Sequence, residues 1–304
     1  MRLDLNPEGA DEHYLEALNS CFGGWGGQRE FDWYFRRPFG GRVADRFVIS
    51  EGGEWLAGSA VSWRRLMGAD GVQRLVGIMT GSWTLPAARG RGCFRAMIDA
   101  SRQRCVEEGA AWLLAFVTKD NGSRRLLQAA GSLMIPTHYL WSEEGAATFE
   151  MQAALSCRQV DPEPDRLESW WRQSAQLRGR HTHLFYEDAA AWTDQFIDRP
   201  LPTDLLEVER LGSVAIERHP VFDRVLASVP GRPELRLQLE RAVHARALHN
   251  GRRFFTFTTS REHAAMLRET LDLGGLDGFI TLLGAAEEAP NDQGIWAVES
   301  GDRV

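Results

Sequence analysis

Residues 81–94 have the sequence GSWTLPAARGRGCF and join a predicted strand to a predicted helix. The strand signal is the run from Val72 to Leu85, which is rich in β-branched, aromatic and glycine residues. After Gly92, apolar side chains recur at helical intervals until Gly109, a residue type that often ends helices. Unpaired N–H groups at a helix N-terminus and arginine side chains both bind phosphate. The segment Arg89-Gly90-Arg91-Gly92 therefore predicts a pyrophosphate-binding loop.

This loop lacks two better-known phosphate motifs. A Walker loop would end in Gly-Lys-Ser or Gly-Lys-Thr, and the dinucleotide fingerprint would need three glycines at Rossmann spacing. Neither pattern is present between residues 81 and 94. A simple tight turn before the helix is the alternative interpretation of two glycines and two arginines.

The elements expected after the helix favour phosphate binding. Residues 111–118 (AWLLAFVT) form a continuous apolar run, which is typical of a strand buried on both faces. Capping residues at 120–123 precede a short predicted helix over 124–130, and another strand follows over 133–141. This order of elements is that of a right-handed β-α-β unit with one further helix and strand.

Over roughly 72–141, and more weakly towards the N-terminus, the chain resembles the GNAT acyltransferase superfamily. The resemblance rests on Trp83-Thr84-Leu85-Pro86, on Arg89-Gly90-Arg91-Gly92, and on Asn121 with Ser123-Arg124-Arg125-Leu126 before Gly131. It implies that the pyrophosphate of acetyl-CoA, or of another short acyl-CoA, binds the loop backbone. It also implies that backbone N–H groups near Trp83 stabilise the oxyanion formed when an amine attacks the thioester. The cofactor-binding residues that it implies are Trp83, Thr84, Leu85, Arg89, Gly90, Arg91, Gly92, Cys93, Phe94, Asn121 and Ser123.

Two positions depart from the family pattern. Phe94 stands where the family usually has a small residue beside the phosphate. Leu127 stands where many members have a tyrosine that protonates the departing thiolate. Because this general acid is absent, another group or solvent would protonate the thiolate, or the chemistry is not acetyl transfer to an amine.

The second half of the chain repeats the order of the predicted elements. A helix over 234–250, an apolar strand over 254–259, a helix from Ser260 and a strand over 279–283 follow one another. The segment 229–233 (VPGRP) takes the place of the phosphate loop, but its prolines have no N–H to donate. A generic α/β domain with accidental similarity is the alternative. We predict an α/β fold of two tandem GNAT-like domains, each a mixed central sheet flanked by helices, with one cofactor site.

The expected domain boundaries follow composition. An acyl-CoA-binding catalytic domain spans 1–145, and a linker spans 146–165, where acidic residues and prolines gather. A degenerate GNAT-like domain spans 166–290, and a C-terminal tail spans 291–304. We expect the chain from Glu287 to Val304 to be loosely ordered, because chain ends generally are.

Four residues are candidates for acid–base catalysis on the acceptor side. Glu30 and Asp32 follow a glycine-rich loop around Trp25, where a carboxylate could deprotonate an amine directly or through water. Ordinary solvated carboxylates are the alternative. His138 and Tyr139 lie on the strand after the short helix and could face the cleft, and a hydrogen-bonded core histidine is the alternative for His138.

Composition and charge limit the location and partners of the protein. The net charge is −7 over 304 residues, with most of the excess acid in the second half, which argues against a large nucleic-acid footprint. No apolar run is long enough for a membrane span and the first residues are no signal peptide, so we expect a cytoplasmic protein. The cysteines are widely spaced, and His181 and His183 lack a third ligand, so no metal site is expected.

The leading functional hypothesis is an acyl-CoA-dependent N-acyltransferase that acts on a small-molecule amine by direct attack on the thioester. Acyl transfer through Cys93 is a second route, because a thiol at a helix N-terminus can have a lowered pKa. One rival is a transferase that uses charged tRNA on the same fold, and another is a non-catalytic acyl-CoA-binding sensor or scaffold. Monomer and homodimer both remain open.

Overall fold

The strands of this protein form one mixed sheet with helices against it. The computed structural model describes residues 1–144, 154, 156–290 and 294–303. Within these residues, thirteen strands belong to a single continuous sheet. None of the helices described is long and apolar enough to cross a membrane. The architecture is therefore mixed α/β, as the sequence predicts.

The first half of the chain carries the predicted strand, loop and helix. Its strands are β1 (Arg2–Leu5), β2 (Asp45–Glu51), β3 (Glu54–Met67), β4 (Gln73–Thr84), β5 (Trp112–Thr118) and β6 (Leu133–Ser142). Its helices are α1 (Asp11–Phe22), α2 (Gln28–Phe31), η1 (Asp32–Arg36), η2 (Pro86–Ala88), α3 (Cys93–Glu107) and α4 (Gly122–Ala129). The loop over residues 89–92 thus lies between η2 and α3, where the sequence places it.

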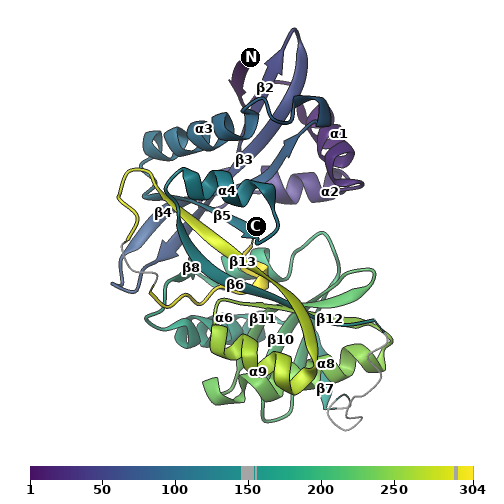
Figure 1. Ribbon diagram of the computed structural model, residues 1–304. Coiled ribbons are helices and arrows are strands. Elements are labelled where there is room, and N and C mark those ends of the chain that lie inside the picture. The colour runs from purple at the N-terminus through teal and green to yellow at the C-terminus, as the bar shows by residue number, and fades with distance from the viewer. Residues whose placement is uncertain (145–153, 155, 291–293, 304) are drawn as a thin grey trace.

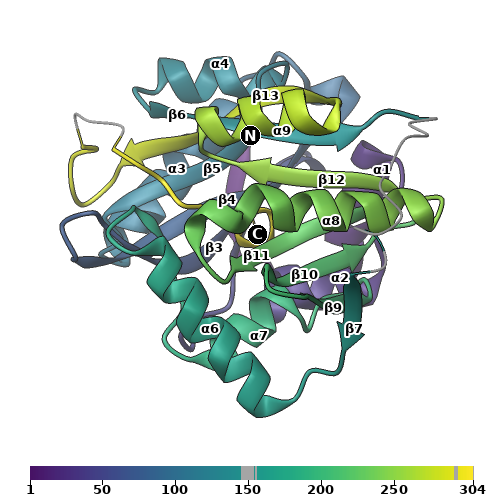
Figure 2. The same cartoon turned by 90° about the horizontal axis from the view of Figure 1, so that it is seen from below.

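The second half begins with helices and ends with a repeat of the same elements. Its strands are β7 (Cys157–Val160), β8 (His183–Phe185), β9 (Thr203–Val208), β10 (Gly212–Arg218), β11 (Phe222–Pro230), β12 (Arg253–Thr258) and β13 (Leu273–Gly284). Its helices are α6 (Pro164–Arg178), α7 (Ala189–Phe196), η3 (Pro233–Leu235), α8 (Arg236–His249), α9 (Arg261–Leu271) and η4 (Ser300–Asp302). Figure 2 shows α6 and α7 on the opposite side of the molecule from α4.

The order β4–η2–α3–β5–α4–β6 recurs as β11–η3–α8–β12–α9–β13, which confirms the predicted tandem arrangement. In the sheet, the last strand of each repeat pairs with the other repeat. Strand β13 lies between β5 and β6, and β6 pairs on its other edge with β12. Figure 1 shows β13 and β6 crossing the middle of the molecule between the two halves. The halves therefore share a sheet rather than merely touch.

A shared apolar core reinforces this junction. One cluster of buried side chains joins Trp112 and Ile135 of the first half to Phe257 and Ile280 of the second. Trp170 of α6 is buried in the same cluster, so its large ring packs where the two halves meet. The domain boundaries at 145 and 165 stay a prediction, and residues 145–153 and 155 of that region lie outside the described residues.

The C-terminal tail is not loosely ordered over its described residues, so that expectation is wrong. Trp296, Val298 and η4 are buried, and η4 packs against β11, β12 and α7. The Ala297 N–H donates to the Thr182 carbonyl oxygen at 2.9 Å. The described end of the tail lies near the middle of the molecule in both views (Figures 1 and 2). Residues 291–293 and 304 of the tail lie outside the described residues.

Candidate active site

The candidate site is a gap between two parallel strands of the first half. Strands β4 and β5 pair only over Val76–Met79 and Trp112–Ala115, and they diverge beyond these residues. Just past the divergence, β4 has an extra residue relative to β3, and Gly81 lies in this bulge at φ +55°. A β-carbon at Gly81 would lie 2.8 Å from the Phe35 ring, so both the backbone and the space require glycine.

The divergence opens a cavity of about 1120 Å³. Its walls come from both halves of the chain, and none of the described residues that line it is acidic. The first half contributes Cys21, Phe22, Trp25, Tyr34, Ile78–Thr84, Ala88–Gly90, Gly92–Arg95, Ala115–Val117, Asn121–Ser123, Leu126 and Leu127. The second half contributes Arg199, Arg224, Ser300 and Arg303. A cavity of this volume, lined by segments from several elements, can hold a large ligand.

The predicted phosphate loop lies along this cavity. Gly90 and Gly92 have φ values of +78° and +83°, which other residues rarely adopt. Gly92 caps α3, and no side chain caps the first turn of that helix, so the turn's N–H groups are left for a ligand. Arg89 lines the cavity, whereas Arg91 points elsewhere and pairs with Glu51 at 2.5 Å. Of the two predicted arginines, the structure thus brings only Arg89 to the cavity.

The backbone N–H groups at the end of β4 point in two directions. The Leu85 N–H donates to the Leu56 carbonyl oxygen at 2.9 Å, so it is already used within the sheet. Alternate residues of an antiparallel strand direct their N–H groups to opposite sides, so the Thr84 N–H points into the gap. There it faces the Cys21 thiol, whose pKa is raised by burial against the opposing effects of Arg89 and of this N–H. Thr84 is therefore the strand residue placed to donate to a ligand.

The short helix α4 forms the other wall of the cavity. The Asn121 side chain accepts hydrogen bonds from the N–H and the hydroxyl of Ser123, at 3.0 and 2.7 Å. Leu127 is buried and lines the cavity, and its aliphatic side chain has no proton to give. Phe94 and the buried Cys93 also line the cavity.

Glu30 and Asp32 are not among the residues that line the cavity. The Glu30 carboxylate accepts a hydrogen bond from the Gly27 N–H at 2.8 Å. The Asp32 carboxylate accepts from the side chains of Gln28 and Arg36, at 2.8 and 3.0 Å. Both acids therefore serve local contacts of the α2 and η1 region, and their catalytic roles stay predictions.

His138 and Tyr139 support the cavity from behind. His138 is buried, and its Nδ1 lies 2.9 Å from Asp277 Oδ1 on the neighbouring strand β13. The hydrogen bond with His138 is the main cause of the lowered pKa of Asp277. The buried Tyr139 ring lies 4.5 Å below the Arg303 guanidinium, which itself lines the cavity. His138 is thus a buried histidine that is hydrogen-bonded to a carboxylate. Tyr139 contacts Arg303, and Arg303 in turn lines the cavity.

Sequence reasoning missed three cavity arginines of the second half. Arg199 follows α7, Arg224 lies on β11, and Arg303 ends the described tail. Each is separated from the loop by more than a hundred residues, and none belongs to a motif. Only the shared sheet and the buried tail bring them to the first half.

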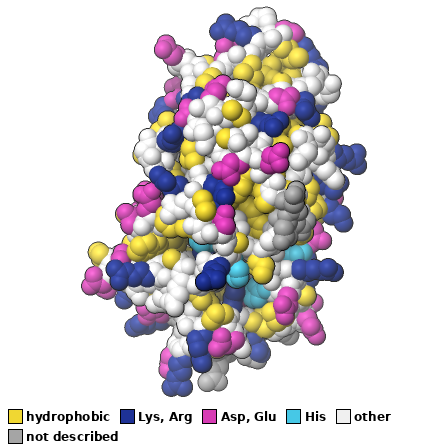
Figure 3. Space-filling model, turned by 90° about the vertical axis from the view of Figure 1, so that its left-hand side faces the viewer, with side chains coloured by type: hydrophobic (Ala, Val, Ile, Leu, Met, Phe, Trp, Pro, Cys, Tyr) yellow, Lys and Arg dark blue, Asp and Glu magenta, His cyan; other side chains and the backbone are white. Residues whose placement is uncertain are grey.

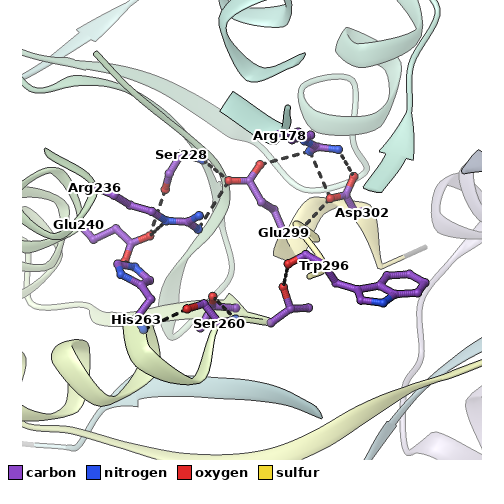
Figure 4. Close-up of polar contacts among 11 residues, drawn as sticks. Arg178, Ser228, Arg236, Glu240, Ser260, His263, Trp296, Glu299 and Asp302 are labelled. Carbon is purple, nitrogen blue, oxygen red and sulfur yellow. Dashed lines mark hydrogen bonds and ion pairs between the residues drawn. The ribbon is translucent and has the colours of Figure 1, made fainter. Parts of the chain in front are cut away.

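The equivalent gap of the second half is filled by the chain itself. Strands β11 and β12 pair only over Phe222–Arg224 and Arg253–Phe255, and η4 packs against both. The Ser228 N–H donates to the Glu299 carboxylate at 3.0 Å (Figure 4). Arg178 holds this segment, with its guanidinium 3.3 Å from Glu299 and 3.2 Å from Asp302. The Ser228 N–H in the second gap is thus already hydrogen-bonded to a carboxylate of the tail and is not available to a ligand.

Comparison with known proteins gives structural matches without sequence matches. No family model and no curated protein matches the sequence. A tandem GNAT protein from the clavulanic acid biosynthesis pathway matches with a TM-score of 0.61 at 14% identity, over 96% of this chain and 100% of that one.

Two further solved structures, both GCN5-related N-acetyltransferases, are also similar. The Kribbella flavida protein has a TM-score of 0.61 at 14% identity over 92% of this chain and 70% of its own. The Anabaena variabilis protein has a TM-score of 0.62 at 14% identity over 92% and 72%. Together with the shared sheet and the gap between β4 and β5, these matches show that the chain has the GNAT fold in its tandem form.

Proposed function

We propose that this protein is an N-acyltransferase that uses an acyl-CoA, with acetyl-CoA as the first donor to test, and acts on a small-molecule amine. The observation that carries the proposal is the single cavity that joins an uncapped, glycine-rich helix N-terminus to the open end of β4. This arrangement fits a nucleotide-bearing thioester, because it offers donors for phosphate at one place and for a carbonyl at another. A cytoplasmic location is part of the same proposal.

The chain's own residues suggest the division of labour. The first-turn N–H groups of α3 and the Arg89 guanidinium would bind the pyrophosphate. The Thr84 N–H would donate a hydrogen bond to the carbonyl oxygen of the thioester and stabilise the negative charge that develops there as an amine attacks the carbonyl carbon. The C–N bond forms, the attacking nitrogen loses a proton to a base or to solvent, the C–S bond breaks, and the thiolate takes a proton. Leu127 cannot supply that proton, so Cys21, Tyr34 or solvent is the source to test.

The two rivals have less support. A transferase that uses charged tRNA would need a basic stripe on its surface. On the face shown in Figure 3, basic and acidic side chains are interspersed. A sensor that binds acyl-CoA without turnover would share the cavity, and only a rate measurement separates it from an enzyme.

The test combines binding and turnover. We expect calorimetry to show acetyl-CoA binding at one site per chain, and a thiol assay to show CoA release with some members of a panel of amines. Arg89→Met should weaken acetyl-CoA binding about tenfold, because one charge-assisted hydrogen bond is lost. The matched control is Arg232→Met in the second-half loop, where the side chain is 72% exposed. Tight binding without thiol release for any amine would favour the sensor, and absence of binding would refute both.

A further inference from the structure

We infer that the acceptor amine carries an oxyanion group, a carboxylate or a phosphate, which binds to Arg199, Arg224 and Arg303. These three residues are called the arginine triad below. The inference rests on the proposed function, because it assigns the acceptor end of the same cavity. Arg89, in the loop before α3, and Arg95, in the first turn of α3, are the cavity's cations near the proposed pyrophosphate site. The triad comes from the other half of the chain, so we assign it to the acceptor rather than to the pyrophosphate.

Two members of the triad are held in place by one carboxylate. Glu217 is buried, and its Oε1 lies 2.8 Å from Arg199 Nε. Its Oε2 lies 3.0 Å from Arg224 Nη1. Arg199 also donates to the Gln195 carbonyl oxygen at 2.9 Å and lies 4.5 Å above the Trp33 ring. Arg199 and Arg224 are therefore fixed in position before any ligand arrives.

Arg303 brings a third charge, and no described residue acts as its counter-ion. Its guanidinium lies 4.5 Å above the Tyr139 ring and 5.4 Å above the Phe257 ring. It forms no ion pair with a described residue, and its Nε is buried without a hydrogen-bond partner. The Nε of Arg224 is likewise buried and unpartnered. Buried donors without partners are costly, and both guanidinium groups belong to side chains that line the cavity, where an oxyanion could bind them.

The charges around the triad do not cancel. Glu217 neutralises one of three positive charges, and no described lining residue is acidic. Burial, reinforced by nearby arginines that include Arg199, lowers the pKa of Arg37 to about 10 and that of Arg64 to about 9. These side chains still carry charge at neutral pH and add to the positive potential. An acceptor with an anionic group would enter such a cavity, whereas a purely cationic polyamine would be repelled.

Matched pairs of acceptors test this inference. Amino acids are compared with their carboxamides, and phosphoethanolamine is compared with ethanolamine, by thiol release at fixed acetyl-CoA. We expect kcat/KM to favour the anionic member of at least one pair by tenfold or more, and the two kinds of pair separate carboxylate from phosphate. Arg303→Met should reduce this preference about tenfold to a hundredfold, because a charge-assisted contact is lost. Arg303→Lys should restore part of it, and Arg232→Met should leave it unchanged.

Equal or higher kcat/KM for the members without the anionic group would overturn the inference, as would an unchanged preference in Arg303→Met. If no amine releases thiol, the proposed function fails, but the triad can still be tested. Calorimetry then compares N-acetylated amino acids with their carboxamides in the wild type and in Arg303→Met. Tighter binding of the anionic form that depends on Arg303 supports the triad, and equal binding refutes it.

Discussion

The two halves contain the same gap between parallel strands, but only one gap is open. In the first, glycines at positive φ precede α3, whose first turn has no side-chain cap, and the gap forms a cavity that no described segment fills. In the second, the loop contains Pro230 and Pro233, and the tail carboxylate of Glu299 takes the Ser228 N–H. The difference teaches that a repeated fold binds a ligand only where its backbone donors remain free.

The segment that fills the second gap also completes the first cavity. Glu299 and Asp302 fix the tail through Arg178, and the next residue, Arg303, lines the open cavity. A single segment of the tail therefore closes the second gap and adds a positive charge to the cavity of the first. A change that loosens this segment should affect both stability and acceptor preference.

The largest expected effect is on the buried ion pairs that close the second gap. Arg178→Met would leave the buried carboxylates of Glu299 and Asp302 without their main counter-charge. We expect the free energy of unfolding in urea to fall by about 3–5 kcal/mol. The control is Arg172→Met on the same helix, whose side chain is 71% exposed and pairs with Glu168 at 2.7 Å. That variant should stay within about 0.5 kcal/mol of wild type. Equal losses in the two variants would show that Arg178 does not hold the gap closed.

A smaller effect should distinguish the helices that follow the two gaps. His244 lies on α8, and burial lowers its pKa to about 4, whereas its counterpart α3 contains no histidine. In the unfolded chain His244 is protonated below about pH 6.5, whereas in the folded chain it stays neutral down to about pH 4. The contribution of His244 to the free energy of unfolding is therefore complete above pH 6.5 and is lost as the pH falls towards 4. We expect a loss of at most about 3 kcal/mol from this group. Urea unfolding between pH 4 and 7 should show a flatter profile for His244→Gln, and an unchanged profile would contradict the assignment.

Most of the fold that could be predicted was predicted from local sequence patterns. The loop over residues 89–92, the helix after it and the repeated element order all depend on neighbours in sequence, so periodicity and turn residues report them. The pairing of β6 with β12 and β13, strands of the other half, left no such signal in the sequence. An apolar strand has the same pattern whichever strand it pairs with, so pairing between distant segments is set by the packing of the whole sheet.

The candidate site shows the same division. The sequence singled out Arg89, Gly90 and Gly92, which line the cavity, because a loop motif is local. It missed Arg199, Arg224 and Arg303, whose contribution depends on tertiary packing. The expectation of a loose tail failed because its composition does not reveal the buried partner, Arg178, more than a hundred residues earlier. Charge pairing at that separation cannot be deduced from one sequence.

The smallest expected effect compares one glycine in each loop. Gly92 has φ +83°, so Gly92→Ala strains the backbone at the start of α3 and displaces its N–H groups. We expect acetyl-CoA to bind about tenfold more weakly, as measured by calorimetry. Gly231 has no positive φ, and a β-carbon there would lie 3.7 Å from the Leu211 carbonyl oxygen, an ordinary contact. Gly231→Ala should therefore leave the dissociation constant unchanged. If both variants weakened binding equally, the second gap would take part in ligand binding and the contrast between the two halves would be lost.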